Sequence, residues 1–475
     1  VVAAILSAAA VPATGQSAAG ADDPHLETVM VYARRLTPVS RVAATVTVID
    51  QARIETTLAT DIRELVRYEP GLSVRNDPFR FGLDTISVRG LGGNRVAVEV
   101  DGIPAAGGFA VGSYADSGRA YVDAAFVDRV EFLRGPASSL YGSDAIGGVV
   151  AMTTLTPESL LARGERDYAV RTDAGYDSES DGWRAAALAA GAIGGTQWLV
   201  GYSRREGHES DTAADVTPNP SEYTNDSALM KVTGAVPGGP MTLTAEAGRI
   251  QQATDVDAFL GVGRFLNTTA LAGDDEMLRY RVSLGQALTG ANAAFDSADW
   301  SAYWQGTETE QDTYEVRRAV PPRTPPVQLD RTFKFDESAF GVEFTAVKSL
   351  GSGSIVHDVV YGFEATRSEL DELRNGLQTD LTTGATTPTI LGETFPLRDL
   401  PLSTVIEVGA FVQDEVQFDD ARWTLVPALR VDYYELTPET DRIYREDNPA
   451  TEPAGVDEVS LAPKLGATYR INDRL

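Results

Sequence analysis

The sequence predicts a mainly β protein, with a compact α/β segment ahead of part of a transmembrane antiparallel β-barrel. Three observations predict this class. Hydrophobic residues make up 43% of the 475 residues, which is enough for a large folded structure. No uninterrupted apolar run is long enough to form a membrane-spanning helix. From about residue 167 onward, apolar and polar residues alternate with the period of two that is typical of β-strands.

The composition excludes several classes of function. The chain carries 69 acidic and 40 basic residues, a formal net charge of −29, which argues against a surface for nucleic acid. Cysteine is absent, so disulfides, zinc–thiolate sites and iron–sulfur clusters are excluded. The three histidines, His25, His208 and His357, are too few to favour a histidine-based metal or catalytic site. We find no acid–base or nucleophile constellation either, and we expect no enzyme.

The first twenty residues are expected to be the remnant of a secretory signal peptide and its cleavage zone. Residues 1–11 are apolar and mostly small, and a polar stretch of small residues follows at 16–23. The alternative is a buried helix. With a signal peptide, the given sequence begins inside a precursor and the mature protein works outside the cytoplasm. Residues 21–41 are then expected to be a mobile segment.

Residues 42–157 are expected to form one α/β domain. A short helix is expected at 61–68, where Ile62, Leu65 and Val66 have helical spacing, with Thr60 as its N-cap. The expected strands and the closing stretch are 45–49, 85–90, 95–102, 127–136 and 138–150. The glycines at 90–93 and 147–148 do not belong to a phosphate-binding or dinucleotide motif. We therefore interpret them as residues that allow tight turns and close approach of the backbone.

Residues 167–475 are expected to form the barrel. Between 406 and 418, for example, Ile406, Val408 and Val412 share one face, while Glu407 and Gln413 share the other. Short turns are expected at 193–195, 237–240, 289–292, 351–354 and 419–420. Long polar segments alternate with them, at 206–223, 251–276, 306–331, 368–402 and 435–457. Short turns at one end and long loops at the other are typical of outer-membrane barrels.

We count about twelve strands in this part of the chain. Large single-chain barrels reach ~22 strands, and an open strand edge is not tolerated in lipid. We therefore expect that about ten strands are missing and that the sequence is truncated at its C-terminus.

The order of several short motifs resembles the plug domain of TonB-dependent outer-membrane receptors. The resemblance is close over 27–156, and the barrel pattern extends it to the rest of the chain. It implies that the α/β domain is a plug inside the barrel of a Gram-negative outer membrane. The residues that match the plug motifs are Arg89, Gly90, Asp101, Gly102, Arg134, Gly135, Pro136, Tyr141, Gly142, Gly147 and Gly148.

Residues 27–31 resemble the family's TonB box, which implies the TonB energy-coupling complex as a partner. The five residues are Glu27, Thr28, Val29, Met30 and Val31. A mobile, extended segment with β-favouring side chains can add as a strand to the sheet edge of a partner. The alternative is that 29–32 form the first strand of the plug.

Stretches 65–71, 90–96 and 135–150 resemble the haem and haemoglobin receptor branch of the family. This implies active import of an iron-containing ligand, with haem or a haemoprotein favoured. In that branch histidines hold the haem, whereas this plug has no histidine. The same kind of receptor with a ferric siderophore or another chelate is the first alternative. A surface adhesin or binding barrel without transport is the alternative from a different class, and it would lack both TonB box and plug.

Aromatic residues in the expected outer plug loops are candidates to stack on a flat ligand, or to pack on the barrel interior. They are Phe79, Phe81, Phe109, Tyr114 and Tyr121. Tyrosinate ligates haem iron in some proteins, so Tyr114 is a candidate substitute for the missing histidine. His208, in the first long outer segment, is a further candidate haem contact, and His357 is expected to be structural.

Charged residues are expected to serve two further purposes. Arg89, Arg95 and Arg134 are expected to pair with acidic groups on the inner barrel wall, because buried charges need partners. A role in binding a substrate anion is the alternative. Acid-rich outer loops, such as 435–458, are expected to be solvated and to bind calcium weakly. Bound calcium would screen repulsion from anionic lipopolysaccharide.

Overall fold

The structure is a computed structural model, and it describes most of the chain after residue 27. The described residues are 28–30, 34, 37–38, 42, 44–57, 59, 61–77, 82–112, 115–117, 122–164, 166–210, 219–320, 324–352, 354–418 and 422–471. Within them, no helix combines the length and the apolar character needed to cross a membrane.

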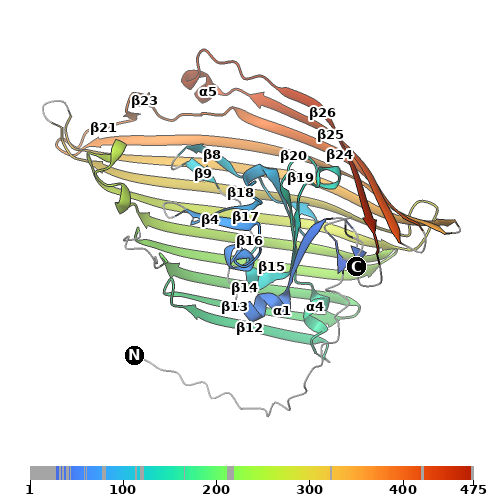
Figure 1. Cartoon of the computed structure of the whole chain (residues 1–475). Coiled ribbons are helices and arrows are strands. Elements are labelled where there is room, and N and C mark those ends of the chain that lie inside the picture. The colour runs from blue at the N-terminus through green and yellow to red at the C-terminus, as the bar shows by residue number, and fades with distance from the viewer. Residues whose placement is uncertain are drawn as a thin grey trace, which may run out of the picture.

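A large antiparallel sheet forms a curved wall, in which each long strand pairs with the next one along the chain (Figure 1). Its strands are β12 (Tyr168–Asp177), β13 (Gly182–Ile193), β14 (Thr196–His208), β15 (Ser221–Val236), β16 (Gly239–Asp255), β17 (Thr268–Thr289), β18 (Ser297–Arg317), β19 (Val327–Ser352), β20 (Ile355–Asp380), β24 (Leu402–Phe418), β25 (Trp423–Glu439) and β26 (Val456–Tyr469). The short β21 (Thr386–Thr387) pairs with β20, and β22 (Thr389–Ile390) pairs with β23 (Glu393–Thr394). The prediction of about twelve barrel strands is confirmed.

The wall has an apolar outer face and a mixed inner face, because successive side chains of a strand point to opposite sides. On β25, Leu429 is 44% exposed, whereas its neighbour Arg430 is 2% exposed. Val408 and Val412 of β24 and Phe363 of β20 belong to the same exposed outer face. An apolar outer face of this kind is typical of strands that meet lipid.

Long and short connections lie at opposite ends of the wall, as the sequence predicts. We call the end with the short connections, such as 194–195 and 237–238, the turn end. The other end, with the connections 209–220, 256–267, 318–326, 381–401 and 440–455, is the loop end. The exception is 178–181, a short connection at the loop end.

The predicted lengths of the long loops are wrong, because the strands continue beyond their apolar part. Residues 306–331 were expected to be loop, but β18 runs to Arg317 and β19 starts at Val327. Similarly, β20 runs to Asp380, well into the expected loop 368–402. The end of β18 is mostly polar on both faces, so hydrophobic periodicity cannot reveal it. The start of β19 does alternate, at Val327, Leu329, Phe333 and Phe335, and the sequence analysis missed that signal.

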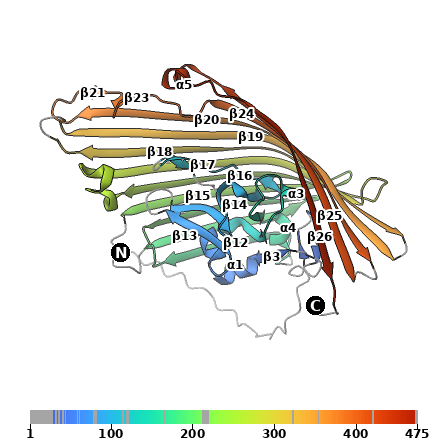
Figure 2. The ribbon, with the colours of Figure 1, turned by 45° about the horizontal axis from the view of Figure 1, so that its top comes forward.

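The plug is built on a five-stranded sheet with the order β3-β10-β11-β6-β7. These strands are β3 (Thr45–Asp50), β10 (Val127–Arg134), β11 (Gly148–Thr154), β6 (Val96–Val100) and β7 (Ile103–Pro104). Its helices are α1 (Gln51–Thr57), α2 (Ile62–Val66), α3 (Ser138–Tyr141) and α4 (Pro157–Leu161), with 3-10 turns η2 (Gly93–Arg95) and η3 (Ala124–Phe126). Two separate hairpins join β4 (Leu72–Asp77) with β5 (Gly82–Val88), and β8 (Phe109–Gly112) with β9 (Ala115–Ser117). The plug lies against the concave face of the wall, which curves around it (Figure 2).

The start of the predicted plug helix needs a correction. The N-cap of α2 is Asp61 rather than Thr60, because the Asp61 side chain accepts a hydrogen bond of 2.9 Å from the amide of Glu64. The sequence analysis also missed α1. Its signal was Asp50, whose carboxylate accepts a hydrogen bond of 2.8 Å from the amide of Arg53.

Candidate functional site

Two of the plug motifs form tight hairpin turns. Arg89–Gly90 and Asp101–Gly102 each have two consecutive residues with positive φ, at +52° and +83° and at +53° and +82°. This is the geometry of a type I′ turn, and glycine adopts it without steric cost. The interpretation of these glycines as turn residues fits this geometry.

Asp101 connects its turn to the wall. Its carboxylate accepts hydrogen bonds from the Thr154 amide at 2.8 Å and from the Thr154 hydroxyl at 2.7 Å. Oδ2 also lies 3.2 Å from Lys231 Nζ on β15 and 3.1 Å from Arg281 Nη2 on β17. Burial alone would raise the pKa of Asp101, but Lys231 and Arg281 lower it, to about 2. The carboxylate is therefore charged and fully paired at neutral pH.

Other contacts hold the same side of the plug on strands β13–β18. Asp123 Oδ2 accepts a hydrogen bond of 3.2 Å from Arg205 of β14. Gln305 of β18 donates a hydrogen bond of 2.8 Å to the carbonyl of Pro104. An apolar cluster joins plug and wall beside them. Its buried members are Phe126, Leu155, Leu160, Leu188, Ala190, Leu199 and Leu229.

The predicted ion pair of Arg134 with the wall is wrong, whereas those of Arg89 and Arg95 stay a prediction. Arg134 is buried, but it pairs within the plug, 3.1 Å from Glu69 and 2.7 Å from the Thr47 hydroxyl. Arg89 and Arg95 are exposed and have no ion-pair partner among the described residues. The plug–wall charges come instead from carboxylates of the plug and from arginines and lysines of the wall.

The remaining motif residues surround α3. Gly142, with φ of +78°, ends this helix. Arg430 of the wall donates a hydrogen bond of 3.0 Å to the Leu140 carbonyl. A side chain at Gly148 would meet the Leu133 carbonyl, so this glycine allows close packing of strands. Tyr141 is buried in an apolar cluster with Phe411 and Val360 of the wall. Gly135 and Gly147 are joined by a backbone hydrogen bond of 3.0 Å, and Pro136 lies next to them.

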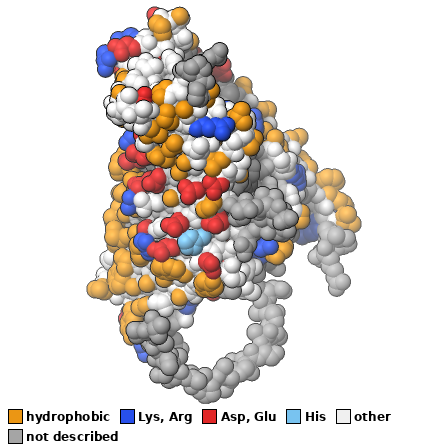
Figure 3. Space-filling view, turned by 90° about the vertical axis from the view of Figure 1, so that its left-hand side faces the viewer, with side chains coloured by type: hydrophobic (Ala, Val, Ile, Leu, Met, Phe, Trp, Pro, Cys, Tyr) orange, Lys and Arg blue, Asp and Glu red, His pale blue; other side chains and the backbone are white. Residues whose placement is uncertain are grey.

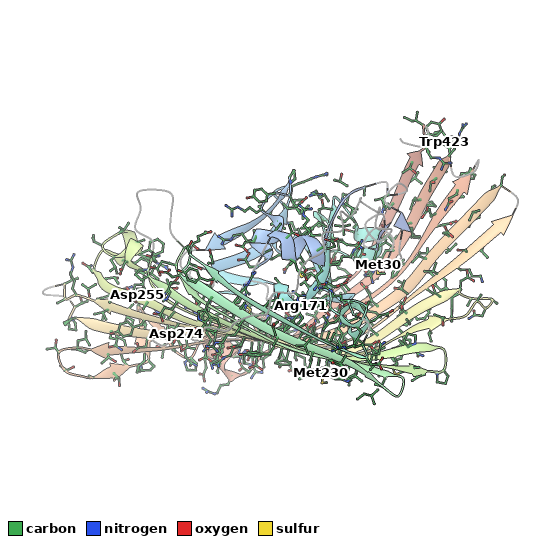
Figure 4. The ribbon with its side chains drawn as sticks, turned by 90° about the horizontal axis from the view of Figure 1, so that it is seen from below. Met30, Arg171, Met230, Asp255, Asp274 and Trp423 are labelled. Atoms are coloured by element: carbon green, nitrogen blue, oxygen red, sulfur yellow. The ribbon has the colours of Figure 1, made fainter. Side chains whose placement is uncertain are left out.

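The N-terminal segment is described at three of its predicted TonB-box residues. Thr28–Val29 form β1, which pairs with β2 (Thr37–Pro38) and not with the plug sheet. The amide of Met30 donates a hydrogen bond of 2.8 Å to Glu131 of β10. Met30 lies toward Trp423 and away from Asp255 and Asp274, so it lies toward the turn end (Figure 4). Glu27 and Val31 lie outside the described residues.

Arg34 of the same segment reaches both plug and wall, and the sequence analysis missed it. Its Nη2 lies 3.0 Å from Glu99 of the plug and 3.3 Å from Glu364 of β20. These partners are distant in sequence, and a lone arginine after a β-favouring stretch gives no signal of them. The only available hint was its position between the predicted TonB box and the plug.

The predicted ligand-binding aromatic residues are mostly not described. Phe79, Phe81, Tyr114 and Tyr121 lie outside the described residues, and Phe109 is the first residue of β8. Their role in ligand binding stays a prediction.

The two described histidines belong to the wall. His208, the last residue of β14, is in the alternating row of the exposed Val200 and Tyr202, on the outer face. Its predicted haem contact remains untested. His357 Nδ1 lies 2.7 Å from Asp414 near the turn end.

At the loop end, buried Arg398 joins two long connections, 381–401 and 440–455. Its guanidinium lies 2.5 Å from Asp371 of β20 and 3.4 Å from Asp441, which caps α5 (Arg442–Asp447). The connection 256–267 has two 3-10 turns, η4 (Asp257–Phe259) and η5 (Gly263–Phe265). Acidic side chains gather at this end of the molecule (Figure 3). Among the described residues, no group of three or more acidic or histidine side chains could hold a metal ion. The expected weak calcium binding stays a prediction.

Two family models match the chain in the order of its two domains. The TonB-dependent Receptor Plug Domain matches residues 38–149, and the TonB dependent receptor-like, beta-barrel model matches residues 237–475. The chain belongs to the TonB-dependent receptor family. The resemblance seen in the sequence is thereby confirmed for the family, and these matches do not distinguish the haem branch.

The curated relatives of this TonB-dependent receptor match it over part of their length. Transferrin-binding protein A of Haemophilus influenzae is 28% identical over 218 residues, which are 42% of this chain and 23% of that protein. The vitamin B12 transporter BtuB of Vibrio vulnificus is 31% identical over 188 residues, which are 38% of this chain and 29% of that protein. Each match thus covers less than a third of the relative.

Solved structures share the fold at low identity. The pyoverdine receptor FpvA of Pseudomonas aeruginosa has a TM-score of 0.64 at 16% identity, over 95% of this chain and 64% of that chain. The ferric citrate transporter FecA has a TM-score of 0.61 at 17% identity, over 92% and 62%. The siderophore receptor PiuA of Acinetobacter baumannii has a TM-score of 0.62 at 14% identity, over 92% and 64%. This chain therefore spans less than two thirds of each of these receptors.

Proposed function

We propose that this receptor imports an iron-containing ligand across the outer membrane of a Gram-negative cell, using energy from the TonB complex. The observation that carries the proposal is a plug lodged on the concave face of the wall, with its N-terminal segment at the turn end. The turn end then faces the periplasm, where TonB works, and the loop end faces outward, where the ligand arrives. Binding and movement of the plug suffice, and no covalent chemistry is needed.

The domain limits follow from the same proposal. Residues 1–20 belong to a signal peptide and its cleavage zone, and 21–41 carry the TonB box. Residues 42–157 are the plug, and 167–475 are part of the barrel. The separate pairing of β1 and β2 supports the distinction between the coupling segment and the plug sheet.

Haem is the ligand that the sequence motifs favour. The named ligands of several relatives support iron more broadly, since their names or titles refer to transferrin, pyoverdine and ferric citrate. A ferric siderophore is the second candidate, because the plug has no histidine to bind haem iron. A non-transporting adhesin is less well supported, because it would need neither a plug nor a coupling segment.

Two measurements on the whole receptor test this proposal. Haem is titrated into the purified receptor while the Soret band is followed, with wild type beside Tyr114→Ala. Growth on haem as sole iron source is compared with growth on ferric siderophores, in cells with and without TonB. A Soret shift and TonB-dependent growth on haem are expected. If neither the Soret shift nor growth on haem is seen, while growth on a ferric siderophore depends on TonB, the imported ligand is the siderophore. Growth that does not depend on TonB would overturn the proposal. An unchanged Soret shift in Tyr114→Ala would show that Tyr114 does not contact haem, and would leave the rest of the proposal as it stands.

A further inference from the structure

Three carboxylates from two domains surround one arginine of the N-terminal segment. The Arg34 guanidinium lies 3.0 Å from Glu99 of the plug, 3.9 Å from Glu343 of β19 and 3.3 Å from Glu364 of β20. The Arg34 side chain is only 9% exposed. Water therefore screens these charges weakly, and each of them depends on its partners.

Aromatic rings hold the same guanidinium from both domains. Its carbon atom lies 4.5 Å from the ring centre of Tyr141 in the plug and 5.3 Å from that of Phe411 in the wall. Cation–π attraction of this kind strengthens when the site is shielded from water. Arg34 thus bridges plug and wall by its charge and by its packing.

The charges around Arg34 do not balance without it. Arg430 also contacts Glu364, but it is shared with Asp432 at 2.6 Å. Glu343 Oε1 makes no hydrogen bond within the described part of the chain. Without Arg34, Glu99 of the plug would face Glu343 and Glu364 of the wall with too little positive charge between them. Buried carboxylates without a cation between them either repel or take up protons, and burial already raises the pKa of Glu99 to about 7. In both cases the attraction between plug and wall at this point is lost.

On the other side of the plug, the contact at Asp101 is paired without help from the N-terminal segment. At Asp101, the two positive partners come from the wall strands β15 and β17, and the hydrogen-bond donors come from the plug itself. No described residue of the N-terminal segment takes part in these contacts. Withdrawal of the segment would leave this contact charged and paired.

We propose that Arg34 is the residue that converts a pull on the N-terminal segment into release of the plug from β19 and β20. When the segment is drawn toward the periplasm, Arg34 leaves its three carboxylates. The contact between β6 and this part of the wall then loses its attraction, while the Asp101 contact keeps the plug on β15 and β17. The plug therefore opens on the β19–β20 side. This inference deepens the proposed import function and rests on it.

A thiol placed in this contact tests the inference without ligand or TonB. Ala97 is 8% exposed and lies on the face of β6 that carries Glu99, in the apolar cluster with Val360 and Phe411. Because the chain has no cysteine, Ala97→Cys gives a single reactive group. Its modification by a maleimide is measured in outer-membrane vesicles that contain the whole receptor, in otherwise wild-type protein and in Arg34→Gln. The Gln variant removes the charge and retains much of the side chain.

We expect Arg34→Gln to raise the modification rate at least about tenfold, because it leaves buried carboxylates unpaired. Adding Glu343→Gln and Glu364→Gln should restore a rate close to that of wild type, since these changes remove the unpaired wall carboxylates. Arg367→Gln, in an exposed pair with Glu369, is the matched control and should change nothing.

An unchanged rate in Arg34→Gln would overturn the inference. A rise that the two glutamine substitutions fail to reverse would also overturn it, because lost packing would then be the cause. These outcomes are separate from failure of the proposed function, in which the rates would behave as expected while no iron ligand is imported.

Discussion

Charged side chains inside this molecule are arranged so that most of them have a partner on a distant part of the chain. Asp101 shows the reason most clearly, since it meets Thr154 of the plug and Lys231 and Arg281 of the wall. The sequence analysis placed Asp101 in the expected strand 95–102, whereas β6 ends at Val100 and Asp101 begins the turn. It could not predict the partners, because nothing local in the chain identifies Lys231 or Arg281. The same limit explains why Arg134 was assigned to the wall although it pairs with Glu69.

Asp101→Asn is expected to weaken the attachment of the plug by about 3 kcal/mol, because it leaves Lys231 and Arg281 with one negative partner fewer. Urea-induced release of the plug, followed by pulse proteolysis, measures this loss. The pKa of Asp101 is lowered to about 2 from an ordinary value of 3.8. The contribution is therefore fully present above pH 3.8 and lost as the pH falls toward 2. Equal stability of wild type and variant at pH 7 would contradict this prediction, and Glu369→Gln in the exposed pair is the control.

The secondary structure elements that position the site were predicted where their hydrophobic pattern is regular. The strands β3, β6 and β10 and the helix α2 lie close to the predicted ranges, and the order of short and long connections also agrees. The polar end of β18 was missed because cross-strand pairing rather than burial of apolar residues stabilises it. The start of β19 was missed although Leu329, Phe333 and Phe335 alternate and are buried. The helix α1 was missed because it follows β3 without an intervening turn.

Val29→Pro is expected to abolish uptake and to leave ligand binding nearly intact. Proline removes a backbone donor and fixes φ in a segment that would have to pair with the edge of a partner's sheet. Val29 belongs to β1, outside the plug sheet, so the plug should still fold. Growth on the ligand as sole iron source is measured beside equilibrium binding to whole cells. Normal growth would show that this segment is not the coupling strand, and lost binding would show that Val29 belongs to the fold of the plug.

Arg398→Ala is expected to loosen the connections 381–401 and 440–455 together. Arg398 is buried and contacts Asp371, Asp441 and the carbonyl of Glu372, so its loss removes the side-chain contacts that join the two connections. The backbone hydrogen bonds of residue 398 to Asp447 and Asn448 remain. Limited proteolysis of the whole receptor should cut both connections several times faster than in wild type. Arg442→Ala is the control, because Arg442 is exposed and pairs only within α5. Faster cutting of one connection alone would contradict a shared tie.

At the scale of the whole molecule, the two faces of the wall have different surroundings. The concave face meets the plug through charged and apolar contacts, whereas the convex face carries exposed apolar side chains such as Val412, Leu425 and Leu429. Alternation in the sequence was enough to predict these two faces, because the side-chain period of a strand is two. It could not predict which strands touch which part of the plug, since that depends on how the wall curves.

Leu429→Arg is expected to destabilise the folded receptor in its membrane by about 2–4 kcal/mol, the usual effect of arginine near the middle of a lipid-facing strand. Leu429 is on the convex face of β25, flanked by the exposed Leu425 and Val431. Thr437→Arg is the matched control, since Thr437 is on the same face of the same strand but nearer the loop end. Its expected effect is about 0–1 kcal/mol, because arginine there reaches the interface. Urea titration of folding into phospholipid vesicles measures both variants of the whole receptor. Equal effects would mean that β25 does not cross the apolar part of the bilayer, and a larger effect at Thr437 would place the membrane nearer the loop end.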